Sequence, residues 1–193
     1  MLFLNKMTDK PLFLIFLGFP GSGKSYFAKQ LAHKLAAVRL NGDSMKTALY
    51  SSYDYIRSNG LIAEANQRGF SAIDYAAEEI LRAGHSVIYD ANNNKRSIRK
   101  KHEALAEKYQ ALPIVVWVQS PAEVAKERAT KRETAQDQPD FTEAQYEEAL
   151  ARATANFNEP DDNERVITLD GTIPFEEQYM SFATQLGALS ITQ

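Results

Sequence analysis

Apolar residues along the chain form short, mainly apolar runs that are separated by longer stretches in which apolar and polar residues mix. The short runs occupy residues 12–17, 37–40, 86–89, 114–118 and 165–169. Such runs, which show no strict alternation, predict strands that are buried on both faces of a sheet. Between them the apolar residues keep helical spacing, most clearly over residues 62–82, where one side carries Phe70, Ile73, Ala77 and Ile80.

Capping patterns mark the ends of several predicted helices. Gly84 follows the helix predicted over residues 62–82 and supplies its stop. Capping boxes at residues 120–123 and 142–145 each predict the start of another helix. Further helices are predicted over residues 26–37, 97–109 and 174–186. Strands that alternate with helices predict an α/β fold of three layers, in which a parallel sheet of about five strands carries helices on both faces.

Length and composition narrow the class of protein. A chain of 193 residues is long enough for one α/β domain and short for two, so residues 1–193 are expected to form one domain, with residues 1–10 as a leader. The net charge of −3 gives no global basic field that would recruit nucleic acid, although a local patch still could. The absence of cysteine excludes disulfides and thiolate zinc sites. Polar residues interrupt the apolar stretches near the start, so we expect no signal peptide, no membrane span and a cytoplasmic location.

The first predicted strand leads directly into a glycine-rich loop. Residues 18–25 match the pattern GxxxxGK followed by Ser at every fixed position, and the predicted strand and helix flank the loop in the required order. Glycines allow successive backbone N–H groups to point at a phosphate, with the positive end of the helix dipole behind them. The sequence therefore predicts a nucleotide-phosphate site formed by Gly18, Pro20, Gly21, Ser22, Gly23, Lys24 and Ser25.

Three polar side chains have expected roles at this site. Lys24 would reach the β- and γ-phosphates of the nucleotide, and the Ser25 hydroxyl would ligate Mg²⁺. Asp90 ends the third predicted strand, at the sheet edge that also carries the phosphate loop. An acid in this position usually holds Mg²⁺ through water, although an aspartate at a strand end can also cap a loop. ATP and Mg²⁺ are therefore the expected cofactors.

Asp43 follows the second predicted strand, and Lys46 comes three residues later. A carboxylate at this edge can accept the proton of an attacking hydroxyl, which a phosphotransferase requires and a bare NTPase does not. Taken alone, residues 41–44 are more typical of a turn and helix cap. Tyrosines at positions 50, 53 and 55 either stack on an acceptor or cover the core.

Arg128 and Arg132 are one helical turn apart, so their guanidinium groups are expected to share a face. They precede a polar, glycine-free segment, and residues 128–141 are predicted to form a small lid. Arginines on a segment that closes over a nucleotide stabilise the charge on the transferring phosphoryl group. The alternative is a solvated helix face on which they pair with Glu127 and Glu133.

Five basic residues crowd the beginning of the helix predicted over residues 97–109: Lys95, Arg96, Arg99, Lys100 and Lys101. The helix dipole disfavours positive charge there, so either an anionic ligand or nearby acids such as Glu103 and Glu107 must balance it. Asn92 and Asn93 are candidates for positioning water or substrate, and they are equally ordinary turn residues. The predicted acceptor-binding residues are Asp43, Lys46, Asn92, Arg96 and Arg99.

In this order the motifs resemble those of small P-loop kinases of the polynucleotide-kinase-like and zeta-toxin-like group. The resemblance extends over residues 12–170 and rests on residues 18–25, 43–46, 89–93, 128–132 and 157–160. It implies an adenylate-kinase-like sheet order 2-3-1-4-5, with Asp43 as general base and Arg128 and Arg132 in a lid over ATP. Polynucleotide kinases of this group carry arginine where this chain has Lys46, and lysine cannot make the same bidentate phosphate contact. The departure weakens the case for a polynucleotide substrate.

The predicted function is ATP- and Mg²⁺-dependent transfer of the γ-phosphate to a hydroxyl acceptor, which is either a small molecule or a nucleic acid. One alternative is a 5′-hydroxyl polynucleotide kinase, with Arg96, Arg99 and Lys100 along the path of the strand. The others are a zeta-toxin-like nucleotide-sugar kinase and a regulatory ATPase without an acceptor. Residues 45–68 contain no motif that names the acceptor. No membrane or obligate protein partner is expected.

Overall fold

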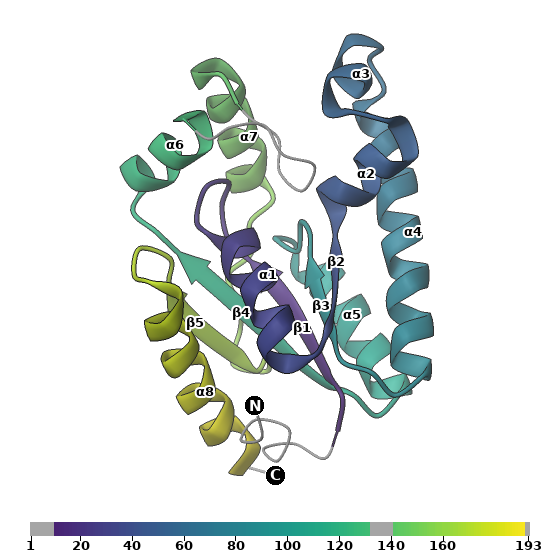
Figure 1. Ribbon diagram of the computed structural model, residues 1–193, viewed down its shortest axis with the longest axis vertical. Coiled ribbons are helices and arrows are strands. Elements are labelled where there is room, and N and C mark those ends of the chain that lie inside the picture. The colour runs from purple at the N-terminus through teal and green to yellow at the C-terminus, as the bar shows by residue number, and fades with distance from the viewer. Residues whose placement is uncertain (1–9, 132–140, 192–193) are drawn as a thin grey trace.

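The computed structural model describes residues 10–131 and 141–191, and all statements below concern these residues. The strands are β1 (Leu12–Leu17), β2 (Val38–Asn41), β3 (Val87–Asp90), β4 (Leu112–Gln119) and β5 (Val166–Asp170). The helices are α1 (Lys24–Leu35), α2 (Gly42–Tyr50), α3 (Tyr53–Ser58), α4 (Ile62–Arg82), α5 (Arg96–Lys108), α6 (Ala122–Lys131), α7 (Glu143–Ala155) and α8 (Phe175–Ile191). Figure 1 shows the sheet at the centre, with helices packed around it.

The five strands form one sheet in the order β2-β3-β1-β4-β5, and every neighbouring pair is parallel. The predicted fold class and sheet order are confirmed. β1 lies at the centre of the sheet and is buried along its whole length. Both of its faces are covered, which explains why its sequence is uniformly apolar and does not alternate.

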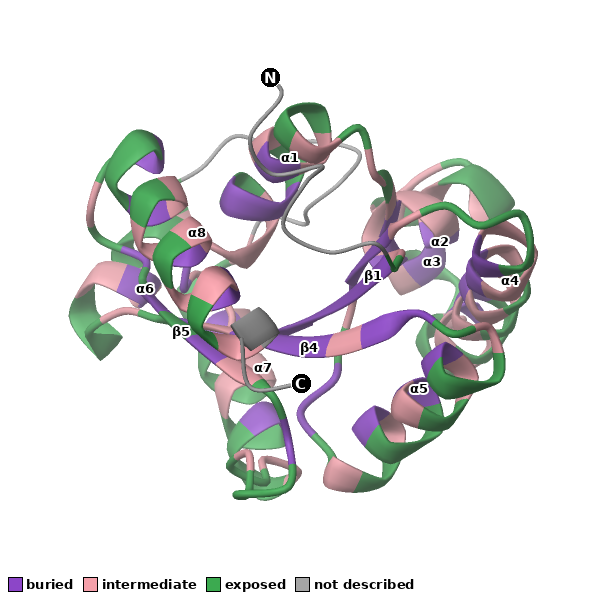
Figure 2. Cartoon of the chain, turned by 90° about the horizontal axis from the view of Figure 1, so that it is seen from below, coloured by how far each residue is buried: buried purple, intermediate pink, exposed green. Residues whose placement is uncertain are grey.

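Alternate residues of β1 point into two separate hydrophobic cores. Leu14 and Phe16 pack with α1 and α8, whereas Phe13 and Ile15 pack with α4 and α5. Figure 2 shows the sheet between these two helix layers. The predicted three-layer architecture therefore follows from the alternation of side-chain direction along each strand.

The region after β2 differs from the sequence prediction. Asn41 ends β2, and its side chain caps α2 by accepting a hydrogen bond from the Ser44 N–H at 2.7 Å, as the cap pattern of residues 41–44 indicated. Asp43 therefore lies in the first turn of α2. The short helices α2 and α3 were not predicted, although Met45, Leu49, Tyr53 and Ile56 keep helical spacing across them.

Pro113 lies inside β4, although proline was expected to precede that strand. A proline removes one ladder hydrogen bond, so it is tolerated where a strand has a neighbour on one side only. Pro113 pairs with Phe13 of β1, whereas β5 begins farther along β4, at the pair Val115 and Val166. β4 can therefore begin before the proline.

Two groups of helices extend beyond the carboxyl ends of the strands. We call α2, α3 and the first half of α4 the α2–α4 arm, and α6 and α7 the α6–α7 arm; Figure 1 shows them on opposite sides of the start of α1. The predicted capping box of Thr142 and Gln145 at the start of α7 is confirmed. Residues 132–140, which include most of the predicted lid, and residues 1–9 of the predicted leader lie outside the described residues. In the part of the chain that is described, none of the helices has the length and apolar character needed to span a membrane.

Candidate active site

The glycine-rich loop connects β1 to α1 at the carboxyl edge of the sheet. Gly21 has a φ of 79°, and a Cβ at this position would lie 2.0 Å from the Ala125 carbonyl oxygen, so only glycine fits. The Lys24 ammonium donates a hydrogen bond to the Phe19 carbonyl oxygen at 2.7 Å, which folds the side chain back over the loop. The loop has the conformation and the cation that a phosphate site requires.

The loop is also held from outside by the turn after β5. Gly171 approaches so closely that a Cβ on it would lie 2.0 Å from the Ser22 carbonyl oxygen. The Ser120 hydroxyl donates to that same Ser22 oxygen at 3.0 Å. Arg128 of α6 donates to the Gly171 carbonyl oxygen at 2.8 Å and lies beside Gly23. Arg128 is therefore next to the phosphate loop, whereas Arg132 lies outside the described residues.

Asp90, at the end of β3, makes contact with the helix that follows the loop. The Ser25 hydroxyl donates to Asp90 Oδ1 at 3.1 Å. The hydroxyl and the carboxylate are hard oxygen ligands, as Mg²⁺ prefers, and a magnesium ion that bridges phosphates needs few protein ligands. Among the described residues, no cluster of three or more histidine, cysteine, aspartate or glutamate side chains forms a metal site of its own. The pair Ser25 and Asp90 fits a metal that arrives with a nucleotide.

Arg39 is a partner of Asp90 that the sequence analysis missed. Its guanidinium group donates to Asp90 Oδ2 from Nε at 3.0 Å and from Nη2 at 2.6 Å, and Asn41 Nδ2 donates to the same oxygen at 2.8 Å. Arg39 and Asn41 are two residues apart on β2, so they share one face of the strand. In the sequence, Arg39 and Asn41 alternate with Val38 and Leu40, and the expected sheet order places the second strand beside the third. Together these two features could have identified Arg39 and Asn41 as partners of Asp90.

A large cleft, with a volume of about 1530 Å³, extends from the phosphate loop into both arms. On the loop side it is lined by Gly18, Gly21, Gly23, Lys24, Ser25, Asp90 and Arg128. In the α2–α4 arm it is lined by Asp43, Lys46, Tyr53, Arg57, Asn66 and Phe70, and Asn92 also lines it. The cleft therefore connects a phosphate site to a separate group of polar side chains.

Asp43 is the carboxylate of that group, and about one third of its side chain is exposed. Lys46 Nζ lies 2.7 Å from Asp43 Oδ1, and the Tyr53 hydroxyl donates to the same oxygen at 3.3 Å. Burial alone would lower the pKa of Lys46, but Asp43 and Tyr53 raise it above its ordinary value. Lys46 therefore stays cationic and balances the charge of Asp43.

The AAA domain family matches residues 13–156, about three quarters of the sequence. This chain belongs to the AAA domain family. No curated protein matches the chain in sequence at a significant level.

Several solved structures have the same fold as this AAA domain. A sugar kinase from Janibacter sp. is 22% identical with a TM-score of 0.65, and the match covers 91% of this chain and 94% of that one. A gluconokinase from Sinorhizobium meliloti is 21% identical with a TM-score of 0.66, covering 96% and 97%. The Mycobacterium tuberculosis APS kinase, in complex with AMPPNP and APS, is 18% identical with a TM-score of 0.63, covering 93% and 99%. The AAA domain thus has the fold of small P-loop kinases.

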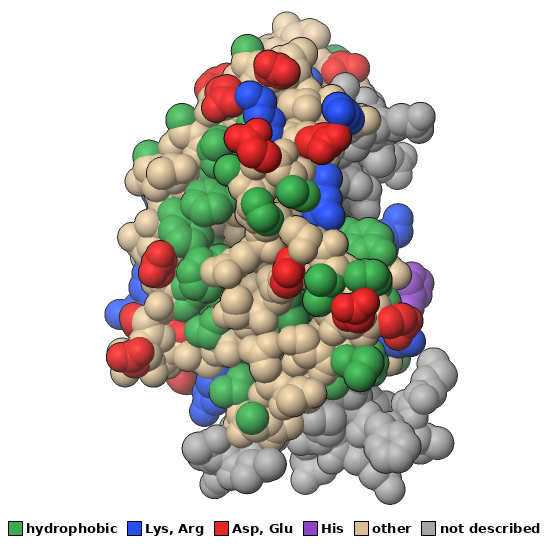
Figure 3. Space-filling view, turned by 90° about the vertical axis from the view of Figure 1, so that its left-hand side faces the viewer, with side chains coloured by type: hydrophobic (Ala, Val, Ile, Leu, Met, Phe, Trp, Pro, Cys, Tyr) green, Lys and Arg blue, Asp and Glu red, His purple; other side chains and the backbone are tan. Residues whose placement is uncertain are grey.

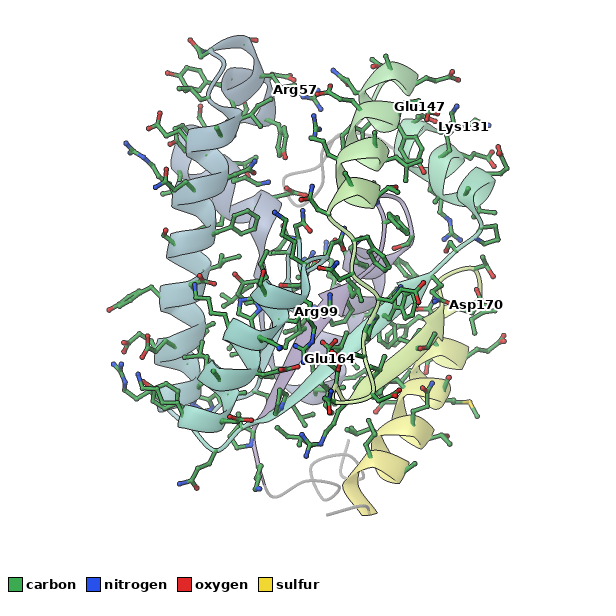
Figure 4. All side chains as sticks on the ribbon, turned by 180° about the vertical axis from the view of Figure 1, so that it is seen from behind. Arg57, Arg99, Lys131, Glu147, Glu164 and Asp170 are labelled. Atoms are coloured by element: carbon green, nitrogen blue, oxygen red, sulfur yellow. The ribbon has the colours of Figure 1, made fainter. Side chains whose placement is uncertain are left out.

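Two of the predicted acceptor-binding residues, Arg96 and Arg99, form ion pairs with carboxylates of this AAA domain. The Arg99 side chain is fully buried and forms an ion pair with Glu164, from Nε to Oε1 at 2.7 Å. It also donates to the backbone carbonyl oxygens of residues 93, 94 and 159. Arg96 pairs with Asp161, Glu103 and Glu164. The prediction that Arg96 and Arg99 bind the acceptor is therefore corrected: carboxylates, some of them distant in sequence, balance these charges. Figure 4 shows Arg99 and Glu164 facing each other.

The asparagines after β3 have different positions. Asn92 lines the cleft, and its side-chain oxygen accepts a hydrogen bond from the Asn94 N–H at 3.2 Å. Asn93 is fully buried and donates to the Phe16 carbonyl oxygen at 2.9 Å, so it fixes the Asp90 turn to β1. Asn158, in the last motif of the resemblance, accepts a hydrogen bond from the Arg96 N–H at 3.1 Å. That motif therefore has a structural role at the start of α5.

We expect Arg99→Met to lower the free energy of unfolding by about 3 kcal/mol, because buried Glu164 would lose both hydrogen bonds from Arg99 and keep only its ion pair with Arg96. Urea denaturation of the variant measures the loss. Arg68→Met is the matched control, since Arg68 is in an exposed ion pair with Glu64 on α4 and should have little effect. Equal stability of the two variants would contradict the structural role of Arg99.

Proposed function

We propose that this AAA domain is a kinase that transfers the γ-phosphate of ATP, bound with Mg²⁺, to a hydroxyl group of a small molecule. The observation that carries the proposal is the continuous cleft between the phosphate loop and Asp43. A nucleotide-driven switch needs the first of these two features only. The sugar kinase and gluconokinase folds that the chain resembles add support for a small-molecule acceptor.

The phosphate-loop end of the cleft would bind the nucleotide. Lys24 would exchange its bond to the Phe19 carbonyl oxygen for contacts with the β- and γ-phosphates, and backbone N–H groups of the loop would donate to them. Ser25 and Asp90 would hold the metal, which neutralises phosphate charge when it is bound. Arg128, which lies beside Gly23 of the loop, would stabilise charge on the γ-phosphoryl group as it is transferred.

Asp43 would act on the acceptor. It accepts the proton of the attacking hydroxyl while that oxygen bonds to the γ-phosphorus, and the bond from this phosphorus to the oxygen of ADP breaks. Hydrogen bonds from Lys46 and Tyr53 converge on Oδ1 of Asp43. The Oδ2 atom would then receive the proton.

A small molecule suits the cleft better than a polynucleotide does. Arg96 and Arg99, which were expected to line the path of a strand, form ion pairs with acids and do not line the cleft. On the face that carries α6 and α8, Figure 3 shows basic side chains of the described residues interspersed with acidic ones, without a continuous basic stripe. Polynucleotide binding usually requires such a stripe.

The proposal is tested by incubating the protein with γ-labelled ATP, Mg²⁺ and a panel of acceptors. The panel contains sugars, sugar acids, polyols, nucleosides, nucleotide-sugars and 5′-hydroxyl oligonucleotides. We expect label to appear on one class of small hydroxyl compound. Label on oligonucleotides would favour a polynucleotide kinase, and release of free phosphate that no acceptor accelerates would favour a regulatory ATPase.

A further inference from the structure

Lys46 is enclosed by protein groups, although it lines the cleft. Its side chain is 11% exposed, and Nζ lies within hydrogen-bond distance of three acceptors. These are Asp43 Oδ1 at 2.7 Å, the Tyr53 hydroxyl at 3.2 Å and Asn66 Oδ1 at 3.2 Å. An ammonium group has three N–H donors, so each of them has a protein partner. None remains for an acceptor molecule.

The aliphatic part of Lys46 is accommodated by a glycine. Gly69 lies inside α4, and a Cβ on this residue would be 2.8 Å from Lys46 Cγ. Alanine is the better helix former at an interior position, so helix formation alone does not require glycine at position 69. The close approach of the Lys46 side chain does require it. α4 therefore provides both the space for the lysine, at Gly69, and a polar partner, Asn66.

Tyr53 connects the two charges. Its hydroxyl donates to Asp43 Oδ1 at 3.3 Å and accepts from Lys46 Nζ, so the three groups form a closed triangle. The triangle is made from α2 and α3, and Asn66 attaches it to α4. Lys46 and Tyr53 both contact Oδ1 of Asp43, so Oδ2 is directed away from the triangle. Asp43 and Lys46 both line the cleft, and Asp43 is the more exposed of the two.

We propose that Lys46 is a positioning residue, which acts with Tyr53 and Asn66 to hold Asp43 in one orientation, and that it does not bind the acceptor. The inference rests on the proposed function, because it concerns the base of that reaction. It replaces the earlier prediction that Lys46 contacts substrate. Its physical basis is that small displacements of a catalytic group cost large factors in rate.

The test uses Lys46→Met, Asp43→Asn and the double variant of the full chain. We measure phosphate release from MgATP, with water in the place of the acceptor, and transfer to whichever compound the acceptor panel identifies. A positioning role predicts that Lys46→Met lowers kcat by roughly 10²-fold, with little change in the KM of the acceptor. It also predicts that the double variant is no slower than Asp43→Asn, because the lysine acts through Asp43.

Two milder variants test the same inference in case Lys46→Met does not fold. Gly69→Ala keeps every polar group but pushes against the lysine stem, and Tyr53→Phe removes one hydrogen bond to Asp43. Each should lower kcat by about three- to tenfold while circular dichroism and MgATP affinity stay unchanged. Lys108→Met is the control, since this exposed lysine pairs with Glu78 away from the cleft.

Three results would overturn the inference. One is a normal kcat in folded Lys46→Met, and another is a change confined to the KM of the acceptor. The third is a double variant whose loss is the product of the two single losses. Failure of the proposed function differs from all three, because the unmodified protein would then bind no MgATP or transfer no phosphate.

Discussion

Asp43→Asn is expected to lower the rate of phosphate transfer by roughly 10²- to 10⁴-fold, which is the usual range for loss of a general base. Asparagine has nearly the shape of aspartate, so the bonds from Lys46 and Tyr53 can be replaced in part. The phosphate loop is unchanged, and MgATP affinity should therefore stay close to that of the unmodified protein. Single-turnover transfer of labelled phosphate measures the first quantity, and calorimetric titration measures the second.

Asp54→Asn is the matched control for this variant. Asp54 is an exposed aspartate in the first turn of α3, and it does not line the cleft. The control variant should transfer phosphate at the normal rate. If Asp43→Asn is equally active, then Asp43 is part of a helix end only, as residues 41–44 alone suggested.

Lys24→Ala is expected to reduce turnover by roughly 10²- to 10³-fold, the range seen when one preorganised donor to a developing charge is removed. Lys24 is only partly buried and contacts the loop carbonyl of Phe19, so its truncation leaves no cavity in either hydrophobic core. The fold should therefore survive. Steady-state kinetics with MgATP measures turnover, and circular dichroism verifies the fold.

Lys108→Ala provides the comparison, because Lys108 is exposed on α5 and does not line the cleft. It should be as active as the unmodified protein. A folded Lys24→Ala variant with normal turnover would remove Lys24 from the proposed mechanism.

The sheet and the phosphate loop could be predicted because their signals are local. The apolar run of residues 12–17 and the pattern of residues 18–25 specify a buried strand and a loop without reference to the rest of the chain. The position of Asp90 could be predicted in the same way, because a residue at the end of a parallel strand lies at the carboxyl edge of the sheet. The sequence signals that predict these parts of the site therefore lie within a few neighbouring residues.

Basic side chains that were assigned to the acceptor have protein partners that sequence neighbours do not fully reveal. Arg99 was assigned to a ligand because its partner, Glu164, is 65 residues away and no pattern connects the two. Lys46 was also assigned to the acceptor, and the proposal that it positions Asp43 rests in part on Asn66, which is 20 residues away along the chain. A charged side chain in a sequence shows that a counter-charge is needed, but only the fold decides whether protein or ligand supplies it.

The contacts around Gly171 also affect how a nucleotide would bind. The turn after β5, the end of β4 and Arg128 of α6 all touch the phosphate loop or its neighbour, through Ser22, Ser120 and the Gly171 backbone. The loop is thus braced by segments that a nucleotide does not have to bring together. Little conformational entropy should then be lost when a triphosphate binds, and more of the contact energy is retained as affinity. Weakening this bracing at Gly171 would loosen nucleotide binding without altering any residue that touches phosphate.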